Sequence, residues 1–304
     1  MTDRWNRWRP RLLLGAFFLL AFLLALRATF PAGAVRQRLA AEAAARGWKV
    51  DAGEVAPAGL LGLSLRDVTA GPRGGLAVAV DRIDVTVPLW PLLTGHRRVA
   101  VDARLWDGRV RGAVDLAGAA RRAEVTVEGV DLARALPLRQ VTGMDVAGVL
   151  AGEASLELPE ARGALPTGTI SLTVKDARLG GGRVAIPGLD GGIGVPPIAL
   201  GELTARLALA AGKGTFERLG LSGGDAEVNA DGLSVVLQSR LDASPIFGKL
   251  RLRPGESLSA RPEGRALRSL LDAALATTRG ADGSFAFQLY GTVGRPLARP
   301  TRAR

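Results

Sequence analysis

Residues 98–116 read Arg-Val-Ala-Val-Asp-Ala-Arg-Leu-Trp-Asp-Gly-Arg-Val-Arg-Gly-Ala-Val-Asp-Leu, and apolar and polar side chains alternate on both sides of the central Trp-Asp-Gly. Alternation with a period of two is typical of a β-strand that has one buried and one solvated face. An Asp-Gly pair between two such runs is a strong hairpin signal. We therefore predict an antiparallel hairpin that turns at Asp107-Gly108.

The same pattern recurs along most of the chain. Alternating runs lie at residues 76–87, 123–128, 150–158, 170–175, 203–209, 233–241, 250–253 and 284–293. Glycine-rich turns at 180–182, 212–214 and 223–225 separate some of them. In the run at 76–87 the apolar phase slips by one residue, which predicts a bulge or a bend. Asp131–Leu136 is expected to form one helical turn with Asp131 as its N-cap.

Only two amphipathic helices are predicted in the region after the N-terminal segment, at 35–46 and 265–276. Two helices cannot cover the apolar faces of so many strands, so the sheet must curl on itself. The expected fold class is mainly β: a long, curved antiparallel sheet that forms a trough, a sandwich or a partly open barrel. The pattern leaves open whether the apolar face is a filled core or an open groove that accepts lipid.

An uncharged segment at 12–26 precedes this region, and four arginines precede the segment: Arg4, Arg7, Arg9 and Arg11. A basic flank before an apolar run keeps the N-terminus in the cytoplasm and directs the rest outside. The apolar side chains expected in the membrane are Leu12, Leu13, Leu14, Phe17, Phe18, Leu19, Leu20, Phe22, Leu23, Leu24 and Leu26. A signal peptide cleaved after Ala34 is the alternative.

The predicted organisation has four parts. Residues 1–11 are cytoplasmic, 12–34 form a transmembrane signal anchor in the cell inner membrane, 35–294 form a β-rich periplasmic domain, and 295–304 form a flexible tail. The protein is thus expected to pass the membrane once, with the bulk of the chain in the periplasm.

Composition narrows the function. The 304 residues carry a net charge of +11, but the basic residues are scattered and are not grouped into a block with aromatic neighbours, so nucleic acid is not an expected partner. Cysteine is absent and His96 is the single histidine, which excludes cysteine-based and histidine-cluster metal sites. The motifs His-Glu-x-x-His and Ser-x-x-Lys are absent from the sequence. We expect no enzyme activity, no metal and no cofactor.

Three segments together resemble a known family. They are the anchor followed by Phe30-Pro31, the segment Leu105-Trp106-Asp107-Gly108-Arg109-Val110-Arg111-Gly112, and the closing Phe287-Gln288-Leu289-Tyr290-Gly291-Thr292-Val293-Gly294-Arg295-Pro296. The chain resembles the type II secretion system protein N family, within the broader AsmA-like group of envelope proteins. The motif residues are Trp106, Asp107, Gly108, Gly291, Thr292 and Pro296.

The family resemblance implies an inner-membrane-anchored periplasmic component of the type II protein secretion system, with a structural role in protein transport. Its expected partners are the inner membrane and other secretion-system subunits. The wider group implies a curved sheet whose concave apolar face shields acyl chains, so lipid handling is the alternative function and phospholipid a further partner. Neither resemblance carries catalytic residues to this chain.

Overall fold

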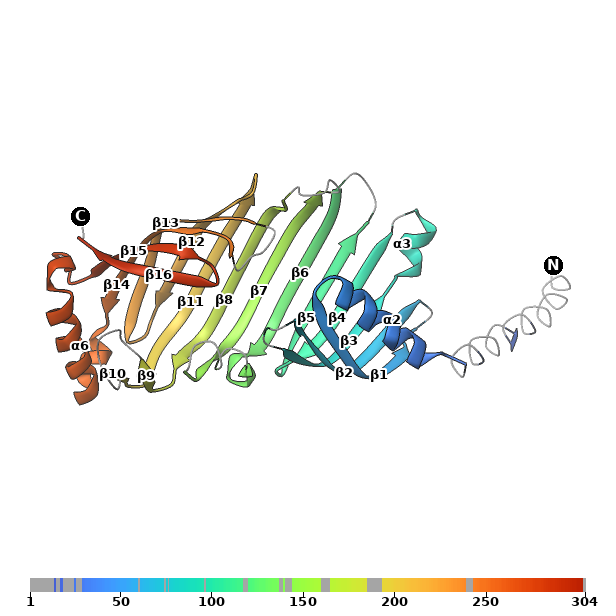
Figure 1. Cartoon of the computed structure of the whole chain (residues 1–304), viewed down its shortest axis with the longest axis horizontal. Coiled ribbons are helices and arrows are strands. Elements are labelled where there is room, and N and C mark those ends of the chain that lie inside the picture. Colours follow the sequence, from blue (N-terminus) through green and yellow to red (C-terminus); the bar gives the residue numbers. More distant parts are fainter. Residues whose placement is uncertain are drawn as a thin grey trace, which may run out of the picture.

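The computed structural model describes residues 14, 17–18, 25, 29–59, 61–73, 75, 77–95, 97–116, 120–136, 139, 144–159, 165–184, 193–238 and 243–302. Fourteen strands form one antiparallel sheet, and two short strands form a separate ribbon. The large sheet follows the order of the chain from β1 to β16, with only the ribbon β9–β10 left out, so every neighbour in the sheet is a neighbour in sequence. Figure 1 shows this sheet as a long curved surface that is not closed.

The strands of the first half are β1 (Trp48–Pro57), β2 (Gly62–Pro72), β3 (Val78–Thr86), β4 (Arg98–Leu105), β5 (Gly108–Asp115), β6 (Ala120–Asp131) and β7 (Val146–Pro159). Those of the second half are β8 (Thr167–Leu179), β11 (Ile198–Ala210), β12 (Lys213–Ser222), β13 (Ala226–Val236), β14 (Ile246–Pro254), β15 (Phe285–Thr292) and β16 (Arg295–Thr301). The ribbon consists of β9 (Gly182–Val184) and β10 (Ile193–Val195). The predicted mainly β fold is therefore confirmed at the level of one antiparallel sheet.

The hairpin at the Trp-Asp-Gly segment is present, but its turn lies one residue earlier than predicted. Trp106 and Asp107 are the two turn residues, with φ of +49° and +60°, and Gly108 is already the first residue of β5. Positive φ at both central positions is the mark of a type I′ turn, which matches the twist of the flanking strands. Gly108 is needed for a different reason, because a Cβ there would lie 2.5 Å from the Cα of Val130.

The phase slip predicted near residues 80–83 is a bend shared by neighbouring strands. Val68 and Leu65 are three residues apart in β2, yet both are buried in one core cluster. Asp67 between them has a φ of +50°, which turns the strand without changing its register with β3. The left-handed residue therefore moves the apolar side chains back to the same face.

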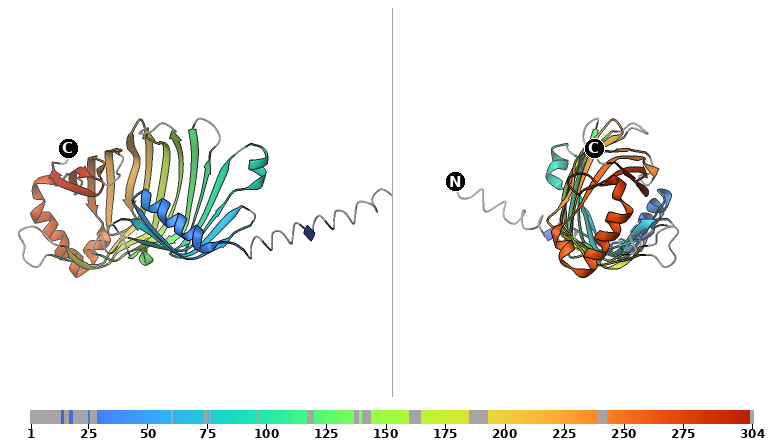
Figure 2. Two further views of the ribbon diagram at one scale, coloured as in Figure 1. Left: turned by 45° about the vertical axis from the view of Figure 1, so that its right-hand side comes forward. Right: turned by 90° about the vertical axis from the view of Figure 1, so that its left-hand side faces the viewer.

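Helices lie at the two ends of the curved sheet (Figure 2). At the N-terminal end, α2 (Ala32–Ala45) packs Val35 and Leu39 on the core cluster of β1 and β2. At the other end, α5 (Glu256–Ala260) leads into α6 (Pro262–Ala274), which crosses the open end of the trough. The two predicted helices are thus present with shifted ends, while α5 and the short α3 (Leu89–Leu93) were not predicted.

The C-terminal segment differs from its prediction. Residues 295–301 are not a frayed tail but form the edge strand β16, which pairs with β15. Pro296 and Pro300 lie four residues apart and cannot donate to a further strand, and an edge strand is the place where a sheet tolerates proline.

The predicted membrane anchor falls mostly outside the described residues. Of its apolar side chains only Leu14, Phe17 and Phe18 are described, each helical and exposed, and the four topology arginines are not described. Within the described part of the chain, no helix combines the length and the apolar character needed to cross a bilayer.

Candidate functional site

Two rows of cross-strand neighbours show that the concave face of the sheet is apolar from one end almost to the other. In the first row every member is apolar or glycine: Val55, Leu65, Ile83, Ala103, Val110, Val127, Gly152, Leu172, Ala205 and Leu219. The second row starts beyond the bulge in β6 and reads Val130, Leu150, Val174, Leu203, Leu221, Val228, Leu252 and Phe285. Together these rows span β1 to β15.

The adjacent positions on the same strands carry the opposite chemistry. Their cross-strand row reads Ser64, Asp84, Asp102, Arg111, Thr126, Glu153, Ser171, Arg206 and Arg218. Since successive side chains of a strand point to opposite faces, this polar row lies on the convex surface, and all its members except the buried Ser64 are at least partly exposed. From β2 to β12 the register therefore separates an apolar face from a charged face, and a slip of one residue in any of these strands would break both.

The apolar face is not packed shut. Leu150, Leu203 and Leu219 are only partly buried, and Leu172 keeps 39% of its surface exposed. A cavity of about 310 Å³ lies against this face, and its walls are almost entirely aliphatic. The lining comes from η1 (Leu132–Arg134) and from β7, β8, β11, β12, β13 and β14, and Arg178 is the one charged residue in it. We call the apolar concave face between α2 and α6 the groove.

At about 4.8 Å between neighbouring strands, fourteen strands give a surface roughly 60 Å long measured across the sheet. A monomeric soluble domain rarely leaves a large apolar surface open to water, and in the middle strands of this sheet the apolar side chains are partly open. The groove therefore has the shape and the chemistry of a binding surface for hydrocarbon, and its only polar handle among the lining residues is Arg178.

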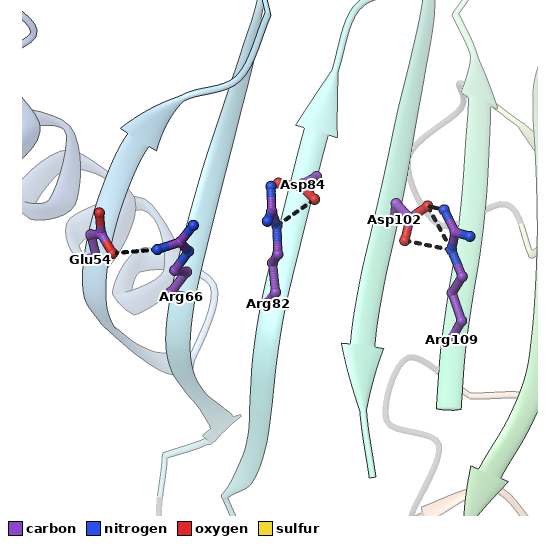
Figure 3. A network of polar contacts seen from close by, with 6 residues as sticks. All are labelled: Glu54, Arg66, Arg82, Asp84, Asp102 and Arg109. Atoms are coloured by element: carbon purple, nitrogen blue, oxygen red, sulfur yellow. Dashed lines mark hydrogen bonds and ion pairs between the residues drawn. The ribbon is translucent and has the colours of Figure 1, made fainter. Parts of the chain in front are cut away.

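Ion pairs organise the convex face (Figure 3). Arg109 Nε lies 2.9 Å from both carboxylate oxygens of Asp102, and Arg66 lies 3.2 Å from Glu54. Arg82 Nε donates to Asp84 at 2.7 Å within β3. The hydrogen bond from Arg109 lowers the pKa of Asp102, and the one from Arg82 lowers the pKa of Asp84, although partial burial opposes both shifts. These carboxylates are consequently ionised partners of arginine, which is the state of a solvated structural face and not of a proton donor.

A buried ion pair that the sequence did not reveal fixes the C-terminal end of the groove. Asp225 follows β12 and is 3% exposed, and its carboxylate accepts hydrogen bonds from the Ala199 N–H at 2.8 Å and from Arg261. Arg261 sits between α5 and α6 and also donates to the Pro197 carbonyl at 3.0 Å. Burial alone would raise the pKa of Asp225, but the hydrogen bonds from Ala199, Ser257 and Arg261 outweigh it and lower the pKa. The pair thus ties α6 to the ends of β11 and β13.

The predicted motif residues do not form one site. Trp106, Asp107 and Gly108 build the β4–β5 turn, where Asp107 pairs with Arg134 at 2.8 Å. Gly291, Thr292 and Pro296 lie in the β15–β16 hairpin, and Gly291 faces Pro296 directly. The strands β6, β7, β8, β11, β12, β13 and β14 lie between the two motifs, so each motif shapes a turn in its own part of the sheet.

In the described segments, no three His, Asp or Glu side chains lie together in a way that could hold a metal ion. Comparison of the chain with models of known families, with curated proteins and with solved structures gave no match. The groove is therefore the candidate site on its own geometry.

Proposed function

We propose that this protein handles lipid, by shielding acyl chains along the groove. One observation carries the proposal: the apolar rows run across almost the whole sheet, which does not close, and in its middle strands side chains such as Leu172, Leu203 and Leu219 remain partly open. A protein that needed this surface only for stability would have filled it, because an unfilled apolar face forfeits both hydrophobic and dispersion free energy.

The energetics suit transport more than storage. Moving an acyl chain from water into an apolar site gains about 0.8 kcal/mol per methylene. Moving the same chain from a bilayer into the groove exchanges one hydrocarbon environment for another, so the free-energy change is small. A lipid could therefore enter from a membrane, move along the aliphatic walls and leave again without crossing water. The charged convex face keeps the outside of the trough solvated.

Site-specific photo-crosslinking in cells tests the proposal. Leu203 and Thr204 are consecutive residues of β11, but Leu203 lines the groove and Thr204 lies on the polar face. A photoreactive amino acid at Leu203 in the full chain should form phospholipid adducts, and the same amino acid at Thr204 should not. Absence of lipid adducts at Leu203, or equal adducts at both positions, would refute lipid binding in the groove.

A role as a structural component of the type II secretion system is the second candidate. It is favoured by the resemblance of the Trp106–Gly108 and Gly291–Pro296 segments, both of which form ordered turns. In that case the protein would be anchored in the inner membrane and contact partner subunits in the periplasm through its polar surface. Loss of exoprotein secretion in a deletion strain with unchanged envelope lipids would favour this role. Altered envelope lipids with normal secretion would favour lipid handling.

A further inference from the structure

One rim of the trough carries an exposed apolar projection that the groove does not explain. The segment between β3 and β4 forms the short helix α3, which stands out from the rim (Figure 1). Trp90 and Leu93 on this helix are each 78% exposed, more than any other large apolar residue described, and Leu89 and Leu92 are each 42% exposed. Such side chains cost free energy in water unless something covers them.

Neighbouring turns extend this projection along the same rim. Leu61, 44% exposed, precedes β2, and its carbonyl accepts from the Val87 N–H at 2.8 Å, just before α3. On the other side, the N–H of Leu116 donates to the Arg97 carbonyl at 2.7 Å, and Leu116 is 39% exposed. We define the apolar rim as Leu61, Leu89, Trp90, Leu92, Leu93 and Leu116.

Two arginines lie close to the apolar rim. No acidic residue occurs between Asp84 and Asp102 in the sequence, and the exposed Arg97 and Arg98 follow α3 after three intervening residues. Arg98 pairs with Glu124 at 3.4 Å and lies opposite Asp115 in β5, so Arg97 is the arginine available to an anionic surface. On the opposite rim, Asp107 forms an ion pair with Arg134, and Asp145 forms one with Arg139. The apolar rim therefore presents aliphatic and indole groups beside Arg97.

We propose that the apolar rim docks on the surface of an anionic lipid bilayer, with Trp90 and Leu93 inserted at the boundary between headgroups and acyl chains. Tryptophan favours this boundary because its ring is apolar and its N–H can meet water or headgroups. Leucine supplies the buried apolar surface, and Arg97 can attract anionic headgroups. A bilayer fits a small, projecting, positively flanked patch better than a protein partner, which would need a larger matched surface.

This docking goes beyond lipid binding in the groove, since it sets how the trough meets a membrane. With the apolar rim on the bilayer, the groove would lie beside the membrane surface, in a position to receive chains from it. Different residues test the groove and the apolar rim. Leu203 could form no lipid adducts while the rim still inserts into the bilayer, or the rim could fail to insert while Leu203 still forms adducts.

The absence of cysteine in the chain allows a clean test with single labels. The full chain carrying Leu93→Cys, labelled with an environment-sensitive fluorophore, is reconstituted into vesicles of phosphatidylethanolamine and phosphatidylglycerol that contain quenchers at known depth. Leu136→Cys is the matched control, because Leu136 is 66% exposed on the opposite rim. Both variants share the same membrane attachment, so any difference between the probes reports on the rim itself.

We expect a blue-shifted emission and several-fold stronger quenching by shallow quenchers at position 93 than at position 136. Adding Trp90→Ser to the Leu93→Cys chain should reduce this quenching, and so should vesicles without phosphatidylglycerol. Equal quenching at both positions would overturn the proposal. A label at position 93 that is shielded from water in native membranes, but not in vesicles that contain only lipid and this chain, would also overturn the proposal in favour of a protein partner.

Discussion

Replacing Arg261 by leucine should loosen α5 and α6 from the sheet, because it leaves the Asp225 carboxylate buried without its cation. The side chain of Asp225 is 4% exposed, and Arg261, the Ala199 N–H and the Ser257 side chain are its hydrogen-bond donors. Breaking a fully buried pair costs about 3–5 kcal/mol. Here Arg261 is itself 43% exposed, and the carboxylate keeps its bond to Ala199. We therefore expect about 2–3 kcal/mol for Arg261→Leu.

Hydrogen exchange of the full chain measures this loss where it occurs. A loss of 2–3 kcal/mol lowers the protection of amides in α5 and α6 by about 30- to 150-fold at neutral pH. The change should be confined to these helices and the adjoining ends of β11 and β13. Arg98→Leu is the matched control, since its partner Glu124 is 58% exposed and such surface pairs contribute about 0–1 kcal/mol.

The pH dependence gives a second, independent readout. The pKa of Asp225 is lowered in the folded chain, so its stabilisation is present above the ordinary carboxyl value of about 3.9 and is lost as the pH falls through the lowered value. Arg261→Leu removes one of the causes that lower this pKa, so the pKa of Asp225 should be higher in the variant than in wild type. Acidification from neutral pH should therefore narrow the difference in amide protection between the variant and wild type. Protection unchanged by Arg261→Leu, or reduced no more than by Arg98→Leu, would refute this reasoning.

Three further substitutions test the sheet and α2. Gly108→Ala should destabilise the chain by about 1–3 kcal/mol in urea unfolding, because its Cβ would lie 2.5 Å from Val130 Cα. Gly33→Ala, in the open part of α2, should stabilise it by about 0.5–1 kcal/mol. Equal effects of the two glycine substitutions would contradict the packing described. Asp102→Asn should flatten the loss of stability on acidification below about pH 4, because the Arg109 hydrogen bond lowers the pKa of Asp102 and its contribution is present above the ordinary carboxyl pKa. An unchanged acid profile would argue against that pair.

Sequence alone could predict the sheet because each strand carries its own alternation. The polar and apolar positions of Arg98–Leu116 lie on opposite faces as expected, and Asp131 caps a helical turn by accepting from the Ala133 N–H at 2.9 Å. The turn at Trp106-Asp107 was placed one residue late because a non-glycine residue with positive φ is a weak signal beside an adjacent glycine.

Features that depend on distant parts of the chain could not be predicted. An open groove and a filled core have the same alternation, and only the three-dimensional structure distinguishes them, through partly exposed side chains such as Leu172 and the cavity beside them. The Asp225–Arg261 pair joins residues 36 positions apart, for which no local pattern exists. Pro296 suggested a frayed tail, whereas an edge strand accommodates it. No element was predicted for residues 88–91, and the tryptophan between the two prolines was the signal available there.

Counting bound lipid tests the central claim most directly, that the open concave face holds acyl chains. The full chain is released from membranes in mild detergent and examined by native mass spectrometry. Three forms are compared: wild type, the double groove variant Leu203→Arg with Leu219→Arg, and the control Thr204→Arg. The control also has arginines at two polar-face positions, because position 218 is already arginine. We predict that wild type and the Thr204→Arg chain retain the same number of phospholipids, and that the double groove variant loses most of them while its circular dichroism stays that of a β-sheet. Equal lipid retention by the folded groove variant would contradict the account.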